Sequence, residues 1–268
     1  MDLYEAAAKL LARAKHAIAF TGAGISAESG IPTFRDPGGI WDQFDPEEFG
    51  TAEGILSLAQ REPERIRQFL LNVVSIFEGA RPNPAHDSLS ELEKRGILST
   101  IVTQNIDNLH SDAGNLSVFE VHGSLFRARC TRCGRRYPLP KAALLRKARE
   151  LLSDPATFRL EKVLTILPAC DCGSITRPDV VMFGEPVQQL NQCFRAATSS
   201  DVMLVLGTSG VVYPAAALPH QAHQAGAKII EINSSENCYS AISEVYIQEP
   251  TGQAMPKVME RLRNLFGN

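Results

Sequence analysis

Short apolar runs alternate with amphipathic stretches along this 268-residue chain. Residues 3–15 carry apolar side chains at helical spacing, which predicts an amphipathic helix. Helical patterns also cover 86–95 and 215–225. Four apolar runs that end in small or polar residues predict buried parallel strands at 16–20, 98–103, 202–207 and 228–233. The alternation predicts an α/β fold with a doubly wound, Rossmann-like parallel sheet.

Two stretches interrupt this alternation. Residues 37–82 have a mostly helical pattern, and residues 127–178 contain two pairs of cysteines and a basic helix near 141–152. We interpret both as insertions that form a smaller lobe, one a helical insertion and the other a metal-binding module. The Rossmann-like domain is then expected to consist of residues 1–36, 83–126 and 179–268.

Composition and charge fit an ordinary globular protein. Hydrophobic residues make up 44% of the chain and charged residues 21%, which is enough to bury a core. The net charge of -3 gives no reason to expect nucleic-acid or membrane-surface binding. No apolar run approaches the roughly 20 residues that span a bilayer. The acidic start, residues 1–5, lacks the features of a signal peptide, so we expect a cytoplasmic protein.

A glycine-rich segment follows the first predicted strand. Gly22 and Gly24 stand where glycines let a backbone approach a pyrophosphate at a helix N-terminus. Gly30 completes a G-x-G-x5-G spacing, which differs from the G-x-G-x-x-G of dehydrogenases. The acidic ribose partner expected about 20 residues further on is not evident either, so a dehydrogenase is a weak interpretation. From the loop alone, a plain strand–helix turn is an equally good one.

The chain resembles the sirtuins, the NAD-dependent protein lysine deacylases, and in particular their bacterial and archaeal members. Residues 21–36, TGAGISAESGIPTFRD, resemble the NAD-binding signature of that family. Four further motifs follow in the family's order: TQNIDNLH at 103–110, EVHG at 120–123, RPDVVMFGE at 177–185 and GTS at 207–209. The resemblance implies that NAD is consumed as a co-substrate. Nicotinamide leaves, and the acyl group passes from lysine to ADP-ribose.

The resemblance also implies roles for individual residues. His122 is expected to be the general base on a ribose hydroxyl, since a neutral imidazole accepts a proton near pH 7. Asn105 is expected at the nicotinamide ribose, and Asp107 at the nicotinamide carboxamide. Both could also be helix N-caps. The residues expected to contact NAD are Gly22, Ala23, Gly24, Ile25, Ser26, Glu28, Phe34, Arg35, Trp41, Gln104, Asn105, Ile106, Asp107, Gly207, Thr208, Ser209, Asn233, Ser234 and Thr251.

The cysteine pairs predict a metal site. Cys130 and Cys133 have the C-x-x-C spacing that supplies two thiolates to zinc, and Cys170 and Cys172 form a closer C-x-C pair. Four thiolates leave no open coordination position, so one Zn²⁺ would be structural. Two alternatives stay open: reduced thiols without metal, and zinc with a different fourth ligand.

The expected substrates are acyl-lysine proteins or peptides. Gly210 stands where many sirtuins carry leucine, which resembles the branch that includes desuccinylases. That branch binds the acyl carboxylate with a Tyr and an Arg three residues apart, and Leu70 and Val73 occupy those positions here. We therefore expect neutral acyl groups to be preferred over succinyl and malonyl. Alternatively, Leu70 and Val73 are only helix core. The peptide is expected to contact Val181, Phe183, Gly184 and Val211.

Two rival functions remain from the sequence. An NAD hydrolase or mono-ADP-ribosyltransferase on the same fold would share the NAD motifs without needing a peptide groove. A binding module that senses NAD or acyl-lysine would need no base, and the presence of both His122 and Asn105 argues against it.

Overall fold

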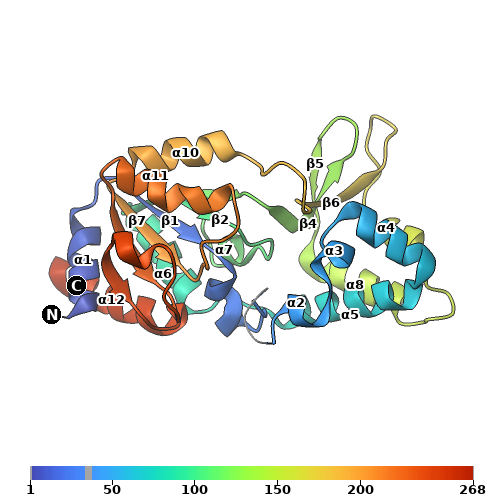
Figure 1. The fold of residues 1–268 in the computed structure, drawn as a ribbon, viewed down its shortest axis with the longest axis horizontal. Coiled ribbons are helices and arrows are strands. Elements are labelled where there is room, and N and C mark those ends of the chain that lie inside the picture. Colours follow the sequence, from blue (N-terminus) through green and yellow to red (C-terminus); the bar gives the residue numbers. More distant parts are fainter. Residues whose placement is uncertain (1, 34–37, 268) are drawn as a thin grey trace.

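A six-stranded parallel sheet forms the centre of the larger lobe in the computed structural model, which describes residues 2–33 and 38–267 (Figure 1). Its strand order is β3-β2-β1-β7-β8-β9. The chain runs outward from β1 through β2 to β3, and later from β7 through β8 to β9, so the order reverses between β1 and β7. The strands are β1 (Ala17–Thr21), β2 (Leu98–Thr103), β3 (Val118–Glu120), β7 (Val202–Leu206), β8 (Lys228–Ile232) and β9 (Ser243–Ile247). The predicted doubly wound fold is confirmed.

Helices cover both faces of this sheet (Figure 1). One face packs against α1 (Leu3–Arg13), α6 (Pro84–Lys94) and α12 (Thr251–Phe266), and the other against α10 (Leu190–Ser199) and α11 (Leu218–Gln224). On β1, Ala17 and Ala19 belong to the first core, whereas Ile18 and Phe20 belong to the second. Because both faces are buried, the strand is apolar throughout rather than alternating.

The smaller lobe contains an antiparallel sheet with the order β5-β4-β6. Its strands are β4 (Gly123–Cys130), β5 (Arg136–Pro138) and β6 (Thr176–Val180). Phe49, Phe69 and Phe126 lie in a core shared with the helices of this lobe. These helices are α2 (Ile40–Gln43), α3 (Pro46–Phe49), α4 (Ala52–Arg61), α5 (Pro63–Gly79), α8 (Lys141–Leu152) and α9 (Leu160–Leu164). Only residues 121 and 122 separate β3 in the large sheet from β4 in the small one.

The remaining short elements are η1 (Ala23–Ser29), α7 (Leu109–Asp112), η2 (Ala215–Ala217) and η3 (Ser240–Ile242). The predicted domain boundaries stay a prediction, and both β4 and β6 extend across them. None of the helices in residues 2–33 and 38–267 combines the length and the apolar character that crossing a bilayer requires.

Candidate functional site

The loops after β1 and β7 touch at the point where the strand order reverses. Gly24 donates its backbone N–H to the carbonyl oxygen of Gly207 at 2.8 Å. A Cβ on Gly24 would lie 2.8 Å from that oxygen, so no larger residue fits. The third glycine, Gly30, ends the 3-10 helix η1 in the left-handed conformation, with φ 83°. The unusual spacing therefore reflects a loop contact and a seven-residue helix. Both loops lie at the carboxyl ends of the strands, where the crevice of an open α/β sheet binds its ligands.

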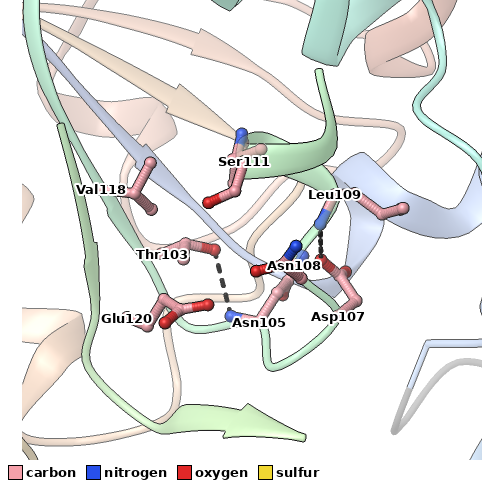
Figure 2. Close-up of a pocket in the computed structure, with 9 residues that line it drawn as sticks. Thr103, Asn105, Asp107, Asn108, Leu109, Ser111, Val118 and Glu120 are labelled. Atoms are coloured by element: carbon pink, nitrogen blue, oxygen red, sulfur yellow. Dashed lines mark hydrogen bonds between the residues drawn. The ribbon is translucent and has the colours of Figure 1, made fainter. Parts of the chain in front are cut away.

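Polar side chains from two strand ends converge beside this loop. The Asn105 amide donates to the carbonyl oxygen of Gly22 and to Ser26 Oγ, both at 3.1 Å. Ser26 Oγ in turn donates to Asp107 Oδ2 at 2.7 Å. Asp107 Oδ1 also accepts the backbone N–H of Leu109, the first residue of α7, at 2.9 Å (Figure 2), but the N-cap position of that helix is Asn108, so Asp107 is not the N-cap. Burial raises the pKa of Asp107, against the hydrogen bonds from Leu109 and Ser26.

His122 lies in the two-residue connection between the sheets. Its Nδ1 is 2.9 Å from the backbone carbonyl oxygen of Gln104. Because a carbonyl can only accept, Nδ1 carries the proton and Nε2 keeps a lone pair. Burial lowers the pKa of His122, although the bond to Gln104 opposes the shift. The imidazole is therefore neutral at neutral pH and can accept a proton.

Gln104 connects β2 to the loop after β7. Its side-chain oxygen accepts the hydroxyl of Thr208 at 3.0 Å. Its Nε2 is buried and has no hydrogen-bond partner among the described residues, a costly state for a donor in a folded protein. A hydrogen-bond acceptor on a bound ligand would remove this cost.

Two asparagines hold the loop after β7. The amides of Asn233 and Asn237 donate to the carbonyl oxygen of Thr208 at 3.2 and 2.8 Å. Ser209 and Ser234 are exposed beside them. The sequence analysis missed Asn237, because no motif surrounds it. Gly207 and Thr208 follow β7, and Asn233 follows β8. The predicted convergence of these two strand ends at one edge of the sheet is therefore observed.

Some residues expected at NAD are engaged elsewhere. Glu28 accepts the backbone N–H of Gly252 at 2.6 Å, so it caps α12. Ile25 is fully buried in the core of the larger lobe. Ala23 and Ile106 are half-buried, and Thr251 is buried with its hydroxyl unpartnered among the described residues. Trp41 lies in the small lobe, with its ring centroid 5.9 Å from that of Phe183. Phe34 and Arg35 lie outside the described residues.

One of the expected peptide contacts is bound to the His122 connection, and the others are exposed. Val181 donates its backbone N–H to the carbonyl oxygen of His122 at 2.9 Å. The side chains of Phe183 and Val211 are exposed, as is Gly184.

A small cavity in the helical insertion includes Val73 in its lining. It carries no charged side chain among the residues that line it: Pro32, Gly38, Gly39, Ile40, Gln43, Phe44, Phe69, Asn72, Val73 and Ile76. Leu70 and Val73 both pack against the small-lobe core, but Leu70 does not line the cavity. Of the two positions expected to select the acyl group, only Val73 therefore faces this cavity.

The four cysteines come together at one end of the small sheet. Their sulfur atoms all lie within 4.8 Å of one another, with Cys130–Cys172 and Cys133–Cys170 separations of 3.5 Å. A tetrahedral zinc with Zn–S bonds near 2.3 Å places its sulfurs about 3.8 Å apart, so the cluster fits this ion. The backbone N–H groups of Cys133 and Arg132 lower the pKa of Cys130 to about 6, which favours the thiolate that a metal needs.

Two buried histidines, His86 and His110, pack against each other next to the end of β1. The rings of His86 and His110 are 4.9 Å apart, and His110 Nε2 is 2.9 Å from Thr21 Oγ1. Burial lowers the pKa of His86 to about 4, and it lowers that of His110 well below its usual value. Both are therefore neutral in the folded protein at neutral pH.

We expect acid to destabilise the protein through this pair. Below pH 6.5 the unfolded chain protonates His86, while the folded chain does so only near pH 4. The free energy of unfolding should thus fall as pH drops, by up to about 1.4 kcal/mol per pH unit for this group. Urea unfolding between pH 7 and 4.5 measures the slope. His86→Gln should flatten it and His16→Gln, at an exposed position, should not. Equal slopes in both variants would contradict the prediction.

The doubly wound sheet, with polar residues gathered where its strand order reverses, defines a nucleotide-binding α/β protein. The model of the Sir2 family matches residues 22–214. The chain therefore belongs to the Sir2 family, and the resemblance to sirtuins is confirmed.

Individual relatives agree with this assignment. The NAD-dependent protein deacylase of Desulfosudis oleivorans is 48% identical, over 97% of this chain and 95% of its own length. A solved Sir2 homolog–NAD complex has a TM-score of 0.77 and 36% identity, covering 97% of this chain and 94% of its own. The solved structure of Sir2Af2 bound to a myristoylated histone peptide has a TM-score of 0.72 and 33% identity, covering 99% of this chain and 98% of its own.

Proposed function

We propose that this chain is an NAD-dependent protein lysine deacylase that prefers neutral acyl groups over succinyl and malonyl. The observation that carries the proposal is the His122 imidazole. Its Nδ1 is held by the Gln104 carbonyl, which leaves the lone pair of Nε2 available to accept a proton. The names of the relatives, NAD-dependent protein deacylases, support the reaction class.

The crevice suits NAD by its geometry and by its unpaired donor. The close approach of Gly24 to Gly207 leaves room for a backbone-lined cradle, and the buried Gln104 Nε2 offers a donor for a ribose oxygen. Asn105, Ser26 and Asp107 form one hydrogen-bonded group that would hold the nicotinamide end. Thr208 and Asn233 would hold the adenosine end. Bound NAD supplies a ribose whose bond to nicotinamide breaks, so that the acyl group can pass from lysine to ADP-ribose.

His122 would act as the general base in this transfer. Its Nε2 would accept the proton of a ribose hydroxyl, and the Gln104 carbonyl would stabilise the proton on Nδ1 as the ring becomes charged. The zinc held by the four cysteines would have no open position for a substrate, so its contribution would be to hold the small lobe together.

The neutral acyl preference rests on the lining around Val73, in which none of the described residues carries a charge. A succinyl carboxylate placed there would lose its water without gaining a cationic partner from residues 2–33 or 38–267 of the lining, which costs several kcal/mol. An acetyl, butyryl or myristoyl group carries no such penalty. The Sir2Af2 complex with a myristoylated peptide shows that one relative accepts a long apolar chain.

A panel of acylated peptides tests this preference. We expect kcat/KM for a succinyl peptide to be at least about 10-fold below that for the matched acetyl peptide. The variant Val73→Arg, at the position that lines the cavity, should reduce the difference between the two kcat/KM values by supplying a cationic partner for the carboxylate. Equal wild-type rates for succinyl and acetyl peptides would overturn the preference, while leaving the deacylase assignment in place.

An NAD hydrolase or mono-ADP-ribosyltransferase is not favoured by the comparisons, since the similar proteins carry deacylase or deacetylase names. The proposed partners are therefore acyl-lysine proteins or peptides, held along the segments around Val181, Phe183 and Val211.

A further inference from the structure

A fully buried carboxylate joins the three strands of the small sheet. Asp179, on β6, has no solvent exposure. Its Oδ2 accepts the Nε–H of Arg127, on β4, at 2.7 Å and that of Arg136, on β5, at 2.9 Å. Its Oδ1 accepts the side-chain amide of Gln188 at 2.8 Å and lies 3.3 Å from Nε of Arg129. Three guanidinium groups and one amide thus converge on a single carboxylate.

The carboxylate is the anionic centre of this cluster. Burial by itself would raise the pKa of Asp179, but hydrogen bonds from Arg127 and Gln188 outweigh it and hold the pKa below its usual value. Arg127 also donates to Glu120 at 2.7 Å. If Asp179 lost its charge, the guanidinium groups of Arg129 and Arg136 would face one another without a counter-charge. The three strands would then be pushed apart where they meet.

The same segment holds the backbone of His122. Beyond Asp179, Val181 donates to the carbonyl oxygen of His122 at 2.9 Å, and Gln188 donates to that of Val121, also at 2.9 Å. Glu120, two residues before His122, is tied to the cluster through Arg127. The connection that carries the imidazole is therefore fixed on both sides by groups bound to Asp179 or next to it in the chain.

The cluster also reaches the cysteines. Arg129 directly precedes Cys130, and Arg136 follows Cys133 by three positions at the start of β5. Arg129 and Arg136 therefore join Asp179 to the two chain segments that carry Cys130 and Cys133.

We propose that Asp179 is a positioning residue for His122: its carboxylate locks the small sheet so that the imidazole is held at the edge of the crevice. This inference rests on the proposed role of His122 as the general base. It predicts that Asp179 affects the transfer step that needs the base, but not the earlier loss of nicotinamide.

The variant Asp179→Asn keeps the size of the side chain and removes its charge. We expect kcat for deacetylation to fall by up to about 100-fold, since small misplacements of a reacting group have effects of that size. The KM for NAD should stay at the wild-type value. Exchange of labelled nicotinamide into NAD, measured with an acetylated peptide, reports the first step alone and should be retained. Zinc content and the circular dichroism spectrum should match those of the wild type.

Two further variants sharpen the test. Glu78→Gln removes a carboxylate from an exposed ion pair of the same lobe, with Arg149, and should leave both activities unchanged. Arg136→Gln removes one partner of Asp179 at a position that is partly exposed. It should lower the rate of deacetylation by a smaller factor and retain nicotinamide exchange. This variant therefore tests the proposal even if Asp179→Asn does not fold.

Unchanged deacetylation in Asp179→Asn and Arg136→Gln would overturn the proposal. So would an equal loss of deacetylation and nicotinamide exchange, because that pattern indicates general damage to the fold. If His122→Ala retained deacetylation, the assignment of the base would fail instead, and the two failures are therefore distinguishable.

Discussion

Replacing His122 with alanine is expected to lower kcat for deacylation by about 10²–10⁴-fold, the usual contribution of a general base. The structure gives the reason. Nδ1 is engaged by the Gln104 carbonyl, so the free Nε2 is the atom placed to accept a proton. Nicotinamide exchange should survive the change, because that step precedes the use of the base. Single-turnover deacylation and labelled-nicotinamide exchange, measured on one preparation, separate the two steps.

The pH dependence adds a second readout of the same group. Burial lowers the pKa of His122, so the imidazole stays neutral to a lower pH than a free histidine. The acid limb of the kcat profile should therefore lie below pH 6.5 and should disappear in the residual activity of His122→Ala. His16→Ala, at an exposed position, is the control and should keep the full profile. Wild-type rates in His122→Ala would remove this residue from its assigned role.

Loss of the metal is expected to have the second largest effect. The four sulfur atoms, all within 4.8 Å of one another, close the end of the small sheet. Without zinc the thiolates would repel one another, and β4 and β6 would lose the ion that holds their ends together. Structural zinc sites contribute several kcal/mol or more to folding, and a loss of about 3 kcal/mol lowers the Tm of a chain of this size by about 6–12 °C.

Cys133→Ser tests this expectation without a chelator. The variant should lose the bound zinc, melt at a lower temperature and lose deacylase activity along with the small lobe. Cys238→Ser, which changes a cysteine far from the cluster in sequence, should keep one zinc per chain. A metal-free preparation with full activity and an unchanged Tm would show that the cluster is a set of reduced thiols.

The bounds of the central strands were predictable because helices cover both faces of the sheet. β2 was predicted with the bounds that it has, and β1, β7 and β8 within one residue at either end, since strands covered on both faces are apolar throughout. β9 was not predicted: Glu244 is exposed between buried and half-buried positions, and five residues of this kind give a weak signal. α12 was missed because Pro256 interrupts its pattern.

The candidate site was predictable where motifs follow the strands and not where distant segments meet. Asn105, Asp107 and His122 stand in short motifs at strand ends. Asp179 stands in a motif as well, but its partners Arg127 and Arg136 are separated from it by more than 40 positions. Only the antiparallel pairing of β4 with β5 and β6 brings them together. Glu28 shows the converse case, in which a residue inside a motif caps α12.

The central claim is that this chain uses NAD to remove acyl groups from lysine. The most direct measurement is nicotinamide release from enzyme and NAD with an acetyl-lysine peptide, with the same peptide unmodified, and with no peptide. The account predicts release only with the acetylated peptide, in a 1:1 ratio with free lysine peptide and with O-acetyl-ADP-ribose, as acyl transfer requires. Equal release in all three reactions, with the acetyl group left on the peptide, would instead identify an NAD hydrolase.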